Sequence, residues 1–181
     1  MIQAGAAFTT ITPPVGAAIQ AAGHNKRARY VRDECEANGV LVSSESDSAA
    51  IVSLDLAGLE LDQARRMRSA VGRGAGIDAN RVAVACTHMH SGPSLMKTHP
   101  DKDVDVDYLD SLERKLEELG RQLRSSIRPA LIGWAMGEER IGYNRRLCWS
   151  DGTHTMHGDA TRDDFRGLEG PDDPSHLVVT V

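Results

Sequence analysis

An apolar run that ends abruptly in a histidine-containing segment constrains the fold of this chain more than any other feature. Residues 82–86 read Val-Ala-Val-Ala-Cys, and they are followed by Thr87, His88, Met89, His90, Ser91, Gly92 and Pro93. Short runs of small and β-branched apolar residues bounded by turn residues are typical of a buried strand. We therefore predict a strand over residues 81–86 that ends at the edge of a β-sheet.

The two histidines directly after this run are candidates for a metal site. Residues two apart in a strand point to the same face, so His88 and His90 share a site if the extended geometry continues through Met89. Imidazole is a common zinc ligand, and a hydrolytic zinc ion needs about three protein ligands and one open position. We interpret the pair as part of a metal site, and the alternative is a strand end with two hydrogen-bonded histidines.

The segments on either side predict alternating strands and helices. Strands are expected over residues 4–11, 39–43, 49–56, 130–136 and 175–181, which are apolar and bounded by turn residues. Helices are expected over residues 61–71 and 106–127, where apolar side chains recur at helical spacing, and Gly72, Gly74 and Gly76 are expected to end the first. Residues 148–174 show little periodicity and predict a long loop. Together these patterns predict an α/β fold with a mixed β-sheet and packing helices.

Composition and charge exclude several classes of protein. With 181 residues, 40% hydrophobic and 26% charged, the chain is typical of one folded domain, and we assign residues 1–181 to it. The net charge is -5 and the basic residues are scattered, which argues against a nucleic-acid partner. No segment reads as a secretory signal or approaches the roughly 20 apolar residues of a transmembrane helix. Because Cys35, Cys86 and Cys148 fit no disulfide framework, we expect a cytoplasmic protein.

Two further polar residues are candidates for the same site. Asp55 follows an apolar strand and could orient a ligand histidine, although a turn or capping role before Gly58 remains open. Arg145 follows the 130–136 strand and could hold an oxyanion or a carbonyl oxygen, with a surface arginine as the alternative. The other histidines considered follow no spacing rule and are interpreted as surface residues: His99, His154, His157 and His176.

Taken together, these residues resemble the N-terminal part of the catalytic domain of the neutral/alkaline non-lysosomal ceramidase family. That family carries Thr-His-Thr-His-Ser-Gly-Pro at a strand end, and residues 87–93 here read Thr-His-Met-His-Ser-Gly-Pro. Weaker matches are the segment from residue 4 to 13, Ser-Leu-Asp-Leu at 53–56, Asn-Arg-Arg at 144–146, and residues 170–174 before the last apolar run. The expected fold is therefore the incomplete N-terminal portion of a larger catalytic domain.

The resemblance implies a zinc amidohydrolase that cleaves the amide of an N-acyl sphingoid base, or another small amide, to fatty acid and amine. By this resemblance His88 is the metal ligand, His90 assists the bound water or the substrate, and Arg145 lies beside the metal. A second histidine, a glutamate and a tyrosine complete the zinc site in the family, and we expect them downstream of Val181.

Two departures from the family pattern shape the expected activity. Met89 stands where the family has threonine, but its side chain is expected to face away from the histidines, so the change should cost little metal binding. With most ligands absent, the 181 residues alone are expected to bind zinc weakly and to show no amidase activity. The competing hypotheses are a non-catalytic protein that keeps this fold without the metal, and a metal hydrolase of another family.

Overall fold

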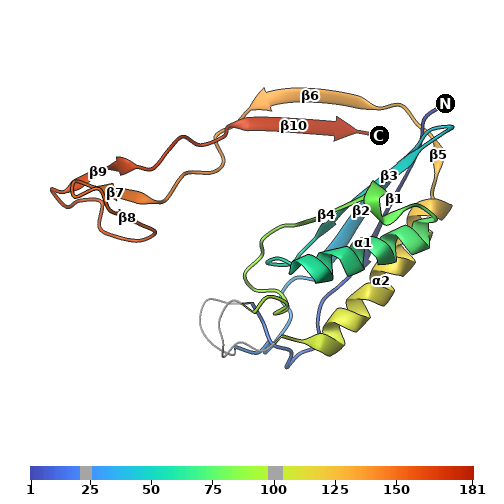
Figure 1. Ribbon diagram of the computed structural model, residues 1–181, viewed down its shortest axis with the longest axis horizontal. Coiled ribbons are helices and arrows are strands. Elements are labelled where there is room, and N and C mark those ends of the chain that lie inside the picture. Colours follow the sequence, from blue (N-terminus) through green and yellow to red (C-terminus); the bar gives the residue numbers. More distant parts are fainter. Residues whose placement is uncertain (21–25, 98–103) are drawn as a thin grey trace. The chain divides into compact units, whose positions relative to one another are not determined.

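The structure of the chain is a computed structural model that describes residues 1–20, 26–97 and 104–181 (Figure 1). The described residues form two compact units, Met1–Leu131 and Ile132–Val181. The histidine tract belongs to the first unit. None of the described helices is long and apolar enough to cross a membrane.

The first unit is built on a five-stranded mixed sheet. Its strands are β1 (Gln3–Thr10), β2 (Glu36–Ser43), β3 (Ser48–Leu54), β4 (Val82–Cys86) and β5 (Arg128–Pro129), in the order β4-β3-β2-β1-β5. The pairs β1/β2 and β2/β3 are antiparallel, whereas β3 and β4 are parallel. Helix α1 (Leu61–Ala75) and the 3-10 turn η1 (Ala79–Arg81) connect β3 to β4. The predicted α/β fold with a mixed sheet is therefore confirmed.

Helices α1 and α2 (Val106–Ser125) pack on one face of this sheet (Figure 1). The predicted apolar stripe of α2 faces the core, where four of its leucines are fully buried: Leu112, Leu116, Leu119 and Leu123. They meet Leu41, Val52 and Leu54 of the sheet in the same core. The other face of the sheet exposes Phe8 and Ile51. The core thus lies between the helices and a single face of the sheet.

The predicted end of α1 at residue 71 is wrong, because the helix continues through Gly72 and Gly74 to Ala75 and is capped by Gly76 at φ 66°. The reason lies in the contact with α2. A Cβ atom at Gly74 would lie 1.9 Å from the Glu117 carbonyl oxygen, and one at Gly120 would lie 2.4 Å from the Val71 carbonyl oxygen. These glycines allow two backbones to approach closely, which is a packing role that leaves the helix intact.

Ion pairs between the same two helices line the outside of their contact. Arg66 pairs with Asp110 at 2.6 Å and also with Glu113, while Arg73 pairs with Glu113 at 2.8 Å and with Glu117 at 3.0 Å. The hydrogen bonds from Arg73 and Arg66 hold the pKa of Glu113 below its usual value. Charged side chains of the two helices therefore help to join them.

The chain after α2 differs from the single strand predicted over residues 130–136. Arg128 and Pro129 first form β5, which pairs with Gln3 and Ala4 of β1 at the edge of the first sheet. Proline is tolerated there because an edge position needs no second donor. A separate strand, β6 (Gly133–Glu138), then begins the second unit and pairs with β10 (Ser175–Thr180). The last strand was predicted correctly.

The predicted loop over residues 148–174 is also only partly right. Within it and just before it lie β7 (Leu147–Trp149), β8 (His154–Thr155) and β9 (Phe165–Leu168), which form a three-stranded sheet in the order β8-β7-β9. Trp149 anchors this small sheet: it is 7% exposed, its ring lies 6.0 Å from that of Phe165, and the Arg162 guanidinium lies 4.7 Å from its centroid. Trp134 of β6, in contrast, is 77% exposed.

Candidate functional site

The candidate site is mounted where the parallel strands β3 and β4 end side by side. The Thr87 amide donates to the Leu54 carbonyl oxygen at 3.0 Å, which extends the β3/β4 ladder one residue beyond β4. Asp55 follows β3 and accepts two hydrogen bonds, from the Thr87 hydroxyl at 3.1 Å and from the Glu36 amide at 3.0 Å. Its carboxylate therefore contacts the residue before His88, and no hydrogen bond to an imidazole is found among the described residues.

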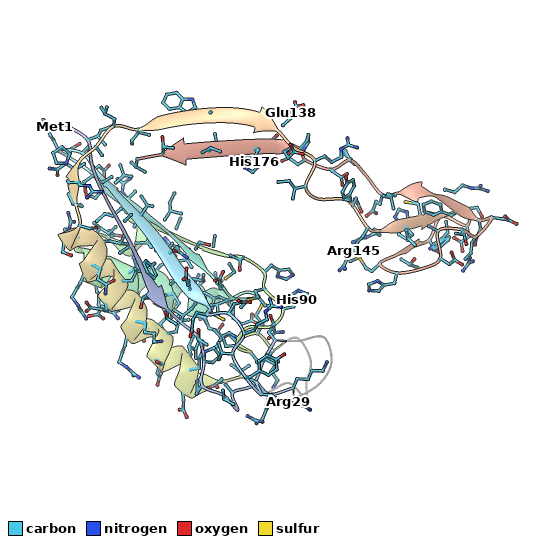
Figure 2. All side chains as sticks on the ribbon, turned by 180° about the vertical axis from the view of Figure 1, so that it is seen from behind. Met1, Arg29, His90, Glu138, Arg145 and His176 are labelled. Carbon is cyan, nitrogen blue, oxygen red and sulfur yellow. The ribbon has the colours of Figure 1, made fainter. Side chains whose placement is uncertain are left out.

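The chain leaves the extended conformation at His88. Strand β4 ends at Cys86, and His88 has φ 61°, in the left-handed region. The condition stated for the pair, an extended geometry through Met89, is therefore not met. The imidazoles of His88 and His90 meet nevertheless, with ring centroids 4.6 Å apart and planes at 79°. A turn brings them together, and both side chains are exposed (Figure 2, where His90 is labelled).

Hydrogen bonding defines the proton positions on both rings. The His88 Nδ1 atom lies 2.7 Å from the Ala57 carbonyl oxygen, which can only accept, so Nδ1 carries a proton and donates it. In the neutral ring the Nε2 atom of His88 then has a free lone pair. It lies 3.1 Å from Nε2 of His90, which therefore donates to it. In a metal-binding histidine, the N–H group of the other ring nitrogen commonly donates a hydrogen bond to a carbonyl or carboxylate in this way.

These positions fit part of a zinc site. A zinc ion at the lone pair of His88 Nε2 would take the place of the proton that His90 donates across the 3.1 Å between the two Nε2 atoms, so that His88 would be the ligand and His90 its neighbour. In the part of the chain that the structure describes, no group of three or more His, Cys, Asp or Glu side chains could hold a metal ion. Of the described residues, the pair His88 and His90 is therefore the part that could contribute to such a site.

Met89 faces the opposite way from its two neighbours. It packs against the hydrophobic core, and a Cβ atom at Gly92 would lie 2.7 Å from its Cε atom. The segment after His90 is buried and tied to the chain after β1: the Gln20 amide donates to the Gly92 carbonyl oxygen at 2.8 Å, and the Ser94 amide donates to the Ala18 carbonyl oxygen at 3.0 Å. The Met side chain therefore anchors the turn that presents the histidines.

Arg145 belongs to the second unit (Figure 2). It is exposed, lies in the segment between β6 and β7, and its guanidinium makes no hydrogen bond or ion pair with the described residues. Its neighbour Arg146 is fixed instead, because its guanidinium pairs with Glu169 at 3.1 Å. Among the other predicted surface histidines, His157 and His176 are exposed and His154 pairs with Glu169 at 2.7 Å, whereas His99 lies outside the described residues.

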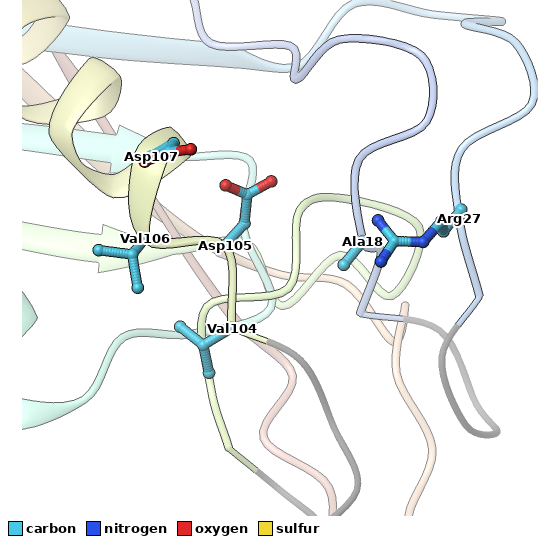
Figure 3. Close-up of a pocket in the computed structure, with 6 residues that line it drawn as sticks. All are labelled: Ala18, Arg27, Val104, Asp105, Val106 and Asp107. Atoms are coloured by element: carbon cyan, nitrogen blue, oxygen red, sulfur yellow. The ribbon is translucent and has the colours of Figure 1, made fainter.

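A pocket of about 370 Å³ lies at the start of α2 (Figure 3). Arg27 and Asp105 are among the residues that line it. Both charged groups serve the fold: Arg27 donates to the Gly16 carbonyl oxygen at 3.1 Å, and Asp105 accepts from the Tyr108 amide at 2.8 Å as the N-cap of α2. We assign no function to this pocket.

The sequence predicted the two histidines but missed the groups that hold them. The Ala57 carbonyl is a backbone group with no side-chain signal. Thr87 is part of the motif, but its bond to Asp55 depends on the pairing of β3 with β4. Gln63 is a further case: it completes the capping box of α1 and donates to the Leu95 carbonyl oxygen at 2.9 Å, which ties the helix start to the histidine segment.

Comparison with known structures finds a similar fold in ceramidases. The crystal structure of neutral ceramidase from Pseudomonas aeruginosa matches 98% of this chain with a TM-score of 0.67 and 17% sequence identity. A structure of a ceramidase complexed with C2 matches 98% of the chain with a TM-score of 0.68 and 17% identity. No protein-family model and no curated protein sequence matches the chain.

The class of fold is therefore α/β, as predicted. More particularly, the chain has the fold of one part of neutral ceramidase, which confirms the resemblance seen in residues 87–93 at the level of fold. The chain spans 29% and 28% of the lengths of the two ceramidase chains. This agrees with the predicted match to a portion of a larger protein.

Proposed function

We propose that this chain supplies His88 and His90 to the active site of a zinc-dependent amide hydrolase of the neutral ceramidase type. The observation that carries the proposal is the Nε2 atom of His88, which the 2.7 Å bond from Nδ1 to the Ala57 carbonyl leaves unprotonated and which accepts from His90 at 3.1 Å. The ceramidase fold supports an N-acyl sphingoid base or a related lipid amide as substrate. The cytoplasmic location stays a prediction.

Each side chain has a role that its chemistry supports. His88 would hold a zinc ion at Nε2, and when bound that ion would supply a Lewis acid for activating water and polarising an amide carbonyl. His90 holds a proton on Nε2 beside that position, so it can give or take a proton during hydrolysis. Arg145 offers a guanidinium without a partner among the described residues, which suits an oxyanion. Its assignment rests on the match of residues 144–146 to the family pattern.

The described residues complete only part of this site. Since a hydrolytic zinc ion needs about three protein ligands and the described chain offers the histidine pair, we expect the 181 residues alone to bind zinc weakly and to leave a fluorescent N-acyl sphingosine uncleaved. Robust turnover by this chain would contradict the view that further ligands are needed.

The zinc site is tested by titrating zinc into the chain with 15N-labelled histidine and following each ring by NMR. We expect the signal of His88 Nε2 to move first, and His88→Ala to abolish that response. The matched control is His176→Ala, an exposed histidine of β10 that should leave the titration unchanged. If zinc shifts the signals of neither His88 nor His90, the result would favour the non-catalytic alternative, a protein that keeps the fold without the metal.

A further inference from the structure

The backbone of His88 has an unfavourable conformation that neighbouring contacts must stabilise. Among the described residues it is the one residue other than glycine with positive φ, at 61°. The left-handed conformation is unfavourable for an L-residue other than glycine, and such a residue keeps it only where surrounding contacts hold it there. The contacts that hold this turn therefore decide where the His88 ring lies.

One hydrogen bond joins the ring to the chain after β3, a second joins it to His90, and two more hold the residue before it. On the ring, Nδ1–H donates to the Ala57 carbonyl oxygen at 2.7 Å. On the preceding residue, the Thr87 amide donates to the Leu54 carbonyl oxygen at 3.0 Å and the Thr87 hydroxyl donates to Asp55 Oδ1 at 3.1 Å. The hydroxyl bond is the last side-chain tie before the chain turns.

The acceptor of that bond is itself fixed. The other carboxylate oxygen of Asp55 accepts from the Glu36 amide at 3.0 Å, and the Asp55 amide donates to the Glu36 carbonyl oxygen at 2.9 Å. Glu36 begins β2, Asp55 follows β3 and Thr87 follows β4. The Thr87 hydroxyl is therefore tied to a carboxylate held across three neighbouring strands, all at the same sheet edge.

We propose that Thr87 is a positioning residue that sets the tautomer of His88. Its hydroxyl bond to Asp55 fixes the start of the left-handed turn, which keeps the His88 ring against the Ala57 carbonyl and so keeps the proton on Nδ1 and the lone pair on Nε2. Its role in metal binding rests on the proposed function, because it acts through His88. The tautomer itself can be measured without any metal.

The experiment is 15N NMR of labelled histidine in the metal-free 181-residue chain at about pH 8, where an ordinary imidazole is neutral. The wild-type chain and Thr87→Ser should both show His88 with the proton on Nδ1. Thr87→Val keeps the shape and removes the hydroxyl, so the majority of His88 should change to the Nε2–H form that free imidazole side chains favour. Thr10→Val, an exposed threonine of β1, is the control and should change nothing.

Zinc affinity gives the second measurement. Loss of a group that orients a metal ligand typically weakens metal binding 10–100-fold, and we expect about that loss for Thr87→Val. An unchanged Nδ1–H tautomer in Thr87→Val would overturn the proposal, and Thr87→Ala replaces it if the valine variant does not fold. A tautomer change in a chain that binds no zinc at His88 would support the positioning role and would overturn the proposed function instead.

Discussion

Replacing Gly74 by alanine should destabilise the first unit, against the usual effect of this substitution. In a helix interior alanine is favoured over glycine by about 1 kcal/mol. Here the added Cβ atom would lie 1.9 Å from the Glu117 carbonyl oxygen and 2.9 Å from the Arg121 amide nitrogen, both backbone atoms of α2. Neither can move away as a flexible side chain would, so α1 and α2 must separate.

The size of the effect follows from that separation. Overpacking typically costs about 1–3 kcal/mol, and a gap of 0.5–1 Å loses roughly a quarter to a half of each dispersion contact. Because the clash is with backbone, we place the cost near 3 kcal/mol, which leaves a net loss of about 2 kcal/mol after the helix-propensity gain. Chemical denaturation followed by helical circular dichroism measures the change in the free energy of unfolding.

Ser69→Ala is the matched control in the same helix. It also raises helix propensity, and Ser69 makes no hydrogen bond through its side chain to the described residues, so its effect should stay within about 0.5 kcal/mol. A Gly74→Ala variant as stable as the wild-type chain, or more stable, would refute the close approach of α1 and α2.

Three further results are expected. Hydrogen bonds from two arginines of α1 lower the pKa of Glu113 in the folded state, so its stabilising effect is present above about pH 4.3 and is lost as the pH falls through the folded value. Glu113→Gln should therefore flatten the acid side of a plot of unfolding free energy against pH. An unchanged slope would count against the ion pairs. Burial raises the pKa of Tyr108, so the contribution of its hydroxyl to the free energy of unfolding is complete below about pH 10 and is lost at higher pH. Tyr108→Phe should lower the free energy of unfolding by about 1 kcal/mol at neutral pH. The same variant should lose less stability than the wild-type chain as the pH rises above about 10. Burial also raises the pKa of Cys35 and Cys86, so a disulfide reagent should modify Cys148 first, and Cys148→Ser should remove the fast phase.

The strands and helices of the first unit could be predicted because burial imposes a period on the sequence. The leucine stripe of α2 and the apolar runs of β3 and β4 show that period directly. The end of α1 could not be predicted in the same way. Gly74 looks like a helix stop until Glu117 and Gly120, far along the chain, are placed against it. Local sequence does not contain that contact.

The candidate site was predicted in part for a related reason. The spacing of His88 and His90 indicated that their side chains meet, but the route is a left-handed turn, whereas the prediction assumed a continued strand. The groups that orient His88 are a backbone carbonyl and a threonine bound to a neighbouring strand end. The short strands β7 to β9 were missed because two to four residues are too few to show alternation.

The uneven distribution of aromatic and helical residues gives each unit its own spectroscopic signal. Both tryptophans, Trp134 and Trp149, belong to the second unit, whereas both α-helices of the described chain belong to the first. Fluorescence therefore follows the unfolding of one unit and circular dichroism near the helix minimum follows the other. Coincident midpoints would indicate one cooperative transition. A ligand stabilises the unit that binds it, so zinc bound at His88 should move the unfolding curve followed by dichroism to higher denaturant. The fluorescence curve would show whether the second unit is stabilised as well.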